Sequence, residues 1–158
     1  ISGKANYESY ALEHLGGQVH KYEELYFHYE LMPYAHNMPE LCNWADLAIC
    51  RSGAMTIAEM AASGAVPIFL PLPTAANDHQ NKNAKFLVDQ GAALSFDQKD
   101  ILIEERVLNA LKQIIAEPDF LSKMRANLKP FANREAARQL AELILSSSRG
   151  DEVAVAIH

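Results

Sequence analysis

The sequence contains few cysteines and few positive charges, and it lacks a long apolar run. Its two cysteines, Cys42 and Cys50, form neither a CxxC motif nor a Cys/His spacing typical of zinc, so we expect free thiols in a reducing compartment. Only 14 Lys and Arg residues stand against 20 Asp and Glu, a net charge of −6, which argues against a nucleic-acid partner because phosphate binding needs clustered cations. No apolar run approaches the roughly 20 residues that span a bilayer.

Motifs that would indicate catalysis or metal binding are also missing. There is no Walker A loop, no GxSxG elbow and no HxH or HExxH pattern among the six histidines. No paired acid and base and no activated nucleophile can be named, so we expect no catalytic residue, no metal site and no cofactor in this chain. The sequence therefore points to binding more than to catalysis.

The order of the expected elements predicts an α/β fold. With 158 residues and 49% hydrophobic residues, the chain suits one domain of ordinary size. Apolar runs predict strands at 18–22, 29–32, 47–50, 66–70 and 92–96. For the segment 23–28 the sequence favours neither a strand nor a helix. Helical periodicity and stop signals predict helices at 7–15, 37–45, 54–63, 79–90, 104–116, 118–128 and 134–145. The alternation indicates a Rossmann-like, doubly wound parallel sheet, followed by a tail at 146–158.

Two successive strands lead into polar loops that open helices, at 51–56 and 77–80. In a parallel sheet such loops lie together at the carboxyl ends of the strands, where ligands bind. In the first loop, Ser52 and Gly53 precede the free N–H groups of Ala54, Met55 and Thr56, which favour an anionic or hydroxyl-rich ligand. The alternative is a capped turn with no ligand.

Three further polar residues follow these loops. Glu59 lies on the helix that Ala54 begins, where its carboxylate could accept two hydrogen bonds from a ribose diol, or could simply face solvent. Asn77 or Asp78 can cap the second helix. Gln80 and Asn83 then supply amide groups that match the neutral hydroxyls of a sugar.

These residues together resemble a known family. Cys50-Arg51-Ser52-Gly53-Ala54 with Thr56 and Glu59, then Asp78-His79-Gln80 with Asn83-Ala84, closely resemble the C-terminal half of the MurG family of bacterial transferases. That family moves N-acetylglucosamine from UDP-GlcNAc to a lipid-linked muramyl pentapeptide (lipid I), which gives lipid II in peptidoglycan synthesis. The likeness covers about residues 2–145 and implies one half of a two-domain GT-B fold, with residues 1–145 as the donor-binding domain.

The resemblance also implies roles for individual residues. Glu59 would bind the ribose hydroxyls, and the backbone at 54–56 would face the diphosphate and sugar. Gln80, with His79 beside it, would contact the GlcNAc hydroxyls, and the main chain near Ala35 would hydrogen-bond the uracil edge. Family members often carry a larger aliphatic residue at Ala35 and, in some cases, Gln at His79.

Two segments of the family are absent from this sequence. One is the N-terminal GTxGH segment, which carries the proposed base and the surface that meets the acceptor and the membrane, and the other is the GGSxGA loop. We therefore expect an incomplete donor-binding domain without its first strand-helix unit, inactive alone. The full-length protein would be an inverting, metal-independent enzyme at the cytoplasmic face of the inner membrane that meets lipid I through its N-terminal domain, and other cell-wall proteins are further candidate partners. The alternative is a non-catalytic nucleotide-sugar-binding subunit that needs a separate membrane partner.

Overall fold

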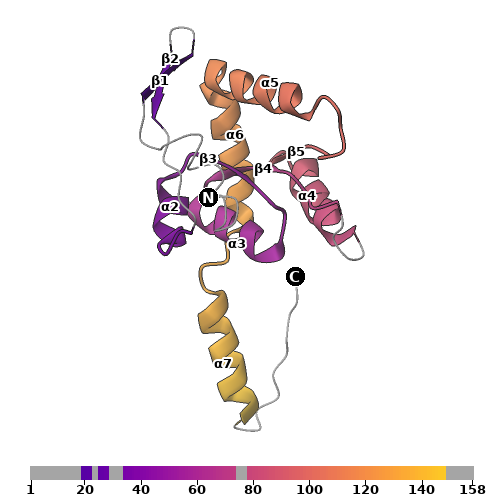
Figure 1. Cartoon of the computed structure of the whole chain (residues 1–158). Coiled ribbons are helices and arrows are strands. Elements are labelled where there is room, and N and C mark those ends of the chain that lie inside the picture. Colours follow the sequence, from indigo (N-terminus) through magenta and orange to yellow (C-terminus); the bar gives the residue numbers. More distant parts are fainter. Residues whose placement is uncertain (1–18, 23–24, 29–33, 74–77, 149–158) are drawn as a thin grey trace. The chain divides into compact units, whose positions relative to one another are not determined.

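The computed structural model describes residues 19–22, 25–28, 34–73 and 78–148. The chain divides into two units, Ile1–Glu40 and Leu41–His158. Figure 1 gives the order of the elements along the chain. The expected helix at 7–15 and the expected strand at 29–32 lie outside the described residues.

The first unit contains a two-stranded antiparallel hairpin. Strand β1 (Val19–Tyr22) pairs with β2 (Leu25–His28), and Tyr22 stands opposite Leu25. The sequence predicted β1, whereas β2 lies in the segment left open. Helix α2 (Met38–Trp44) begins in this unit, after Asn37 as expected, and ends in the second unit.

The second unit is built on a parallel sheet of three strands in the order β3-β4-β5. These are β3 (Leu47–Cys50), β4 (Val66–Phe69) and β5 (Leu94–Ser95), and Cys50 and Phe69 pair at the carboxyl ends. All four residues of the central strand β4 are buried, which explains its continuous apolar sequence. The predicted parallel sheet is confirmed, although β5 is shorter than the predicted strand at 92–96.

The helices of this unit follow the predicted positions closely. They are α3 (Ala54–Ser63), α4 (His79–Asp89), α5 (Ile103–Ala116), α6 (Pro118–Leu128), the short 3-10 helix η2 (Lys129–Phe131) and α7 (Ala136–Ser148). Helix α3 ends at Gly64, whose φ of +82° is the left-handed conformation that glycine adopts at helix ends. Helix α7 continues to Ser148, three residues beyond the predicted helix end at 145, and residues 149–158 lie outside the described residues.

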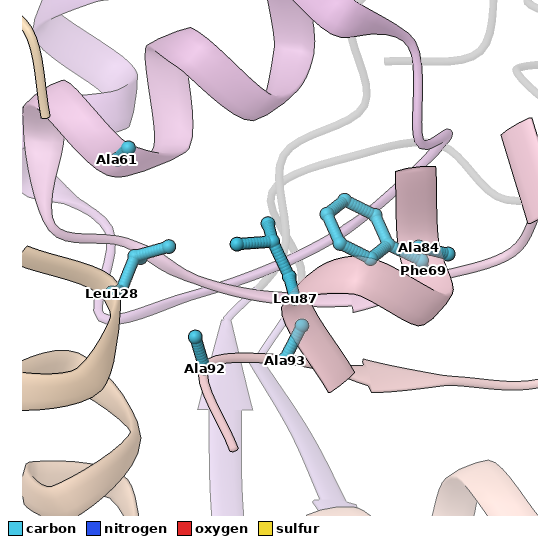
Figure 2. Packing of buried hydrophobic residues seen from close by; sticks show 7 residues of the cluster. All are labelled: Ala61, Phe69, Ala84, Leu87, Ala92, Ala93 and Leu128. Carbon is cyan, nitrogen blue, oxygen red and sulfur yellow. The ribbon is translucent and has the colours of Figure 1, made fainter. Parts of the chain in front are cut away.

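The core of the second unit lies between the sheet and helices α3, α4 and α6. Seven buried residues form one apolar cluster, and Figure 2 shows the side chains of Leu87 and Leu128 pointing toward one another within it. A smaller cluster contains Cys42, Met60 and Ala65, with Cys50 packed against it. Both cysteines are free, as expected. The core thus supports the carboxyl ends of β3 and β4, where the predicted site residues lie.

No helix in the described part of the chain is long and apolar enough to cross a membrane.

Candidate functional site

The loops after β3 and β4 meet, as the sequence predicted. The hydroxyl of Ser52, in the loop before α3, donates a hydrogen bond to the main-chain carbonyl of Gln80 in the first turn of α4, with 2.7 Å between the oxygens. The side-chain amide of Asn83 donates to the carbonyl of Ser52 at 3.1 Å. Two segments about 30 residues apart in sequence are therefore joined directly.

The first turn of α3 offers N–H groups that have no intrahelical acceptor. No side chain in the described part of the chain caps this helix, and its first intrahelical bond runs from the N–H of Ile57 to the carbonyl of Gly53. The N–H groups of Ala54, Met55 and Thr56 precede that bond and have no intrahelical acceptor. Ala54 and Met55 are exposed and Thr56 is half-buried, so this turn is accessible to an anion.

Gly53 has a backbone conformation that any residue can adopt, with φ −68° and ψ 150°. Among the described residues, a Cβ atom added there would meet only Thr56 Oγ1, at 3.9 Å, which is an ordinary van der Waals contact. The fold therefore does not require glycine at this position. A close approach by a ligand to the backbone would require it.

Glu59 lies one turn further along α3 and is exposed. Within the described part of the chain its carboxylate makes no hydrogen bond and no ion pair. Burial raises the pKa of the Cys50 thiol, at the end of β3, and Glu59 lies close enough to add to that shift. An available acceptor thus stands near the carboxyl end of the strand.

Helix α4 begins at His79, whose side chain is exposed. The Gln80 side chain is oriented by the loop after β4, because its Oε1 accepts a hydrogen bond from the N–H of Leu72 at 2.9 Å. The Nε2 amide group of Gln80 has no partner among the described residues and remains as a pair of donors. Those donors suit the oxygen atoms of sugar hydroxyls.

Three expectations need adjustment. Ser52 is completely buried and its hydroxyl is already bonded, so it holds the loop and does not offer that hydroxyl to a ligand. Asn83 is half-buried, and its Nδ2 group is engaged by the carbonyl of Ser52. Asp78 occupies the N-cap position of α4 with φ +57°, but its side chain does not cap the helix; it accepts a hydrogen bond from Asn81 instead.

Ala35 is buried and belongs to the first unit, so the site described above consists of residues of the second unit alone. Its expected contact with uracil stays a prediction.

Sequence reasoning assigned no role to Arg51. Its Nη1 donates to the carbonyls of Leu70, at 2.7 Å, and Pro71, at 3.3 Å, and to the Gln98 side chain, at 2.5 Å. Arg51 thereby connects the ends of β3 and β4 with the loop after β5. The position of a charged residue directly after an apolar strand could have indicated a role for Arg51. Its partner Gln98 lies 47 residues away, and no sequence pattern connects the two.

A separate cavity of about 860 Å³ contains none of the predicted site residues. Residues 61–64 at the end of α3 line it, together with parts of α6 and the segment that follows η2. It lies at the opposite end of α3 from Gly53, so we do not connect it with the site.

Comparison with known proteins identifies the family of this fold. Residues 2–144 match the model of the glycosyltransferase family 28 C-terminal domain. The chain is 39% identical over 117 residues to a relative from Thermoanaerobacter sp. (strain X514), which covers 74% of this chain and 32% of the relative. It is 34% identical over 146 residues to a relative from Pseudomonas paraeruginosa, which covers 89% of this chain and 41% of the relative.

Both relatives are named UDP-N-acetylglucosamine–N-acetylmuramyl-(pentapeptide) pyrophosphoryl-undecaprenol N-acetylglucosamine transferase. Among solved structures, MurG of Acinetobacter baumannii superposes with a TM-score of 0.64 at 37% identity, over 74% of this chain and 33% of that protein. The chain thus spans roughly a third of the length of the relatives it matches. By its sequence match over residues 2–144, supported by this structural likeness, the chain belongs to the glycosyltransferase family 28 C-terminal domain family.

Proposed function

We propose that this chain is the UDP-GlcNAc-binding part of a transferase that adds N-acetylglucosamine to undecaprenyl-diphospho-muramoylpentapeptide (lipid I) in peptidoglycan synthesis. The names of the relatives supply this donor and this acceptor. We assign acceptor binding and the catalytic base to the part of the relatives that lies outside the match. We also propose that the reaction takes place at the cytoplasmic face of the inner membrane, with the enzyme bound peripherally.

The observation that carries the proposal is the glycine at position 53. Neither its φ nor the space around it requires glycine. It lies directly before an uncapped helix N-terminus, where a phosphate group gains both hydrogen bonds and a favourable interaction with the helix dipole. A ligand phosphate that approaches this backbone closely accounts for both features.

The remaining roles follow from this placement of the diphosphate. The N–H groups of residues 54–56 bind its oxygens, so a metal ion is not needed to neutralise it. The carboxylate of Glu59, which has no partner in the part of the chain that the structure describes, accepts hydrogen bonds from the ribose diol. At the neighbouring helix, His79 and the donor amide of Gln80 face the sugar hydroxyls. The transfer inverts the anomeric configuration.

Calorimetric titration with UDP, UDP-GlcNAc and UDP-GalNAc tests the assignment of the ribose to Glu59. Replacing Glu59 by Ala removes charge-assisted hydrogen bonds and should weaken binding by about 1.5–3 kcal/mol for each bond lost. The loss should be equal for all three ligands because they share the ribose. Glu104, exposed in the first turn of α5, provides the matched control, and Glu104→Ala should bind as the wild type does.

Unchanged affinity in Glu59→Ala would refute the ribose assignment. A wild-type chain that binds none of the three nucleotides would refute the proposed function itself. The chain alone should show no transfer to lipid I, and detection of lipid II would contradict the assignment of the base and acceptor surface to another part of the protein.

A further inference from the structure

Ser52 is the buried polar residue at the centre of the candidate site, with no exposed surface. It takes part in two hydrogen bonds to α4. Its hydroxyl donates to the Gln80 carbonyl at 2.7 Å, and its own carbonyl accepts from Asn83 Nδ2 at 3.1 Å. We call these three residues the Ser52 clasp.

The clasp joins the two helix N-termini that make up the site. Ser52 directly precedes Gly53 and the first turn of α3, while Gln80 and Asn83 belong to the start of α4. Because the clasp bonds reach α4 from both the hydroxyl and the carbonyl of one buried residue, they restrain the distance and the angle between the two first turns. Breaking either bond leaves a polar atom without its hydrogen-bond partner, which costs free energy. The two first turns are therefore held in their relative positions.

The Gln80 side chain depends on this arrangement. Its Oε1 is bonded to the N–H of Leu72, and its main-chain carbonyl is bonded to Ser52. Both ends of the residue are therefore held, and the direction of the Nε2 donors is set relative to α3. The fixed direction of the Nε2 donors adds no affinity for a ligand that contacts α3 alone. It adds affinity for a ligand that contacts both α3 and α4.

We infer that Ser52 and Asn83 are positioning residues that select a nucleotide sugar over the bare nucleotide. This inference rests on the proposed function and replaces the expectation that both side chains touch the donor. Within the second unit, UDP contacts the first turn of α3 and Glu59, which lie on one helix. The sugar of UDP-GlcNAc must also meet His79 and Gln80, so its binding depends on the clasp.

The test is the ratio of the dissociation constants for UDP-GlcNAc and UDP, measured by calorimetry on the full 158-residue chain. Ser52→Ala and Asn83→Leu should each raise this ratio about fivefold, as expected when one hydrogen bond no longer orders the sugar site, while the affinity for UDP stays within about twofold of wild type. Ser52→Thr retains the hydroxyl and should restore the wild-type ratio, even if the added methyl group lowers the melting temperature.

Two matched substitutions serve as controls at sites outside the clasp. Ser63 bonds a carbonyl within α3, and Asn127 bonds the carbonyl of Gly91, so Ser63→Ala and Asn127→Leu make the same chemical changes elsewhere. Both should leave the ratio unchanged.

Equal weakening of UDP and UDP-GlcNAc in the clasp variants would overturn the inference, because a merely structural role lowers both affinities together. An unchanged ratio would overturn it as well. In either case the wild-type chain would still bind both ligands, so the proposed function would stand. A wild-type chain that binds neither ligand would overturn both.

Discussion

Arg51 Nη1 lies 2.7 Å from the carbonyl oxygen of Leu70 and donates a hydrogen bond to it. The two residues follow adjacent parallel strands, β3 and β4, directly at their carboxyl ends. The same nitrogen also reaches Gln98, beyond β5. One side chain therefore links the ends of all three strands of the sheet, beside the loop that carries Gly53.

Arg51→Ala should lower the free energy of unfolding by about 1 kcal/mol, because it removes charge-assisted hydrogen bonds at a partly exposed site. Urea unfolding followed by circular dichroism measures this change. Arg106→Ala is the control, since its guanidinium forms a surface ion pair with Asp100 at 2.8 Å and should contribute less. Equal losses in the two variants would show that the strand-end contacts add nothing beyond an ordinary surface pair.

Gly53→Ala should separate folding from binding. The variant should unfold at the wild-type urea concentration or slightly above it, because alanine fits the native φ and restricts the unfolded chain. Its affinity for UDP should nevertheless fall at least about tenfold, since the Cβ atom occupies the position from which the phosphate approaches. Calorimetry and urea unfolding of the same preparation provide both values.

Gly64→Ala is the matched control at the other end of α3. There φ is +82°, so alanine is strained although a Cβ atom would have space. We expect a loss of about 1 kcal/mol in stability and an unchanged affinity for UDP. If Gly53→Ala bound UDP normally, the proposed close approach at position 53 would be wrong.

The raised pKa of the Cys50 thiol predicts that the free energy of unfolding depends on pH in the alkaline range. Burial raises the pKa of this thiol from 9.0 to about 11, and the neighbouring Cys42 and Glu59 act in the same direction. The folded state therefore holds the proton more tightly than the unfolded state does. The contribution of the protonated Cys50 thiol to the free energy of unfolding is complete below pH 9 and is lost as the pH rises from about 9 to 11.

Urea unfolding at a series of pH values from 8 to 11 should thus show a decline in stability that Cys50→Ala reduces. Comparing the slopes of the two proteins removes the effect of lysines and tyrosines, which titrate in the same range. Parallel slopes would show that the thiol titrates alike in both states. The same shift predicts slow alkylation of Cys50 in the native protein at pH 8.

Local patterns predicted most of the elements correctly. Three signals each depend on only a few neighbouring residues: the apolar run 47–50, Gly64 at the end of a helix and Pro118 at the start of another. The elements that they mark could therefore be predicted without tertiary information. Strand β2 was left open because its four residues, Leu25–His28, are stabilised by pairing with β1. Pairing of that kind depends on a partner strand, which a local sequence pattern does not reveal.

The sequence alone determined the family, the parallel sheet and the edge at which polar residues gather, because each depends on short motifs or on hydrophobic periodicity. Only the tertiary structure decided what those polar residues do. Ser52 and Asn83 have the same chemistry as residues that bind sugar hydroxyls, but hydrogen bonds across about 30 residues engage them within the protein. The carboxylate of Glu59 has no partner among the described residues, and the backbone conformation at position 53 does not need glycine. Which polar group is satisfied internally depends on distances between elements, and no local pattern contains those distances.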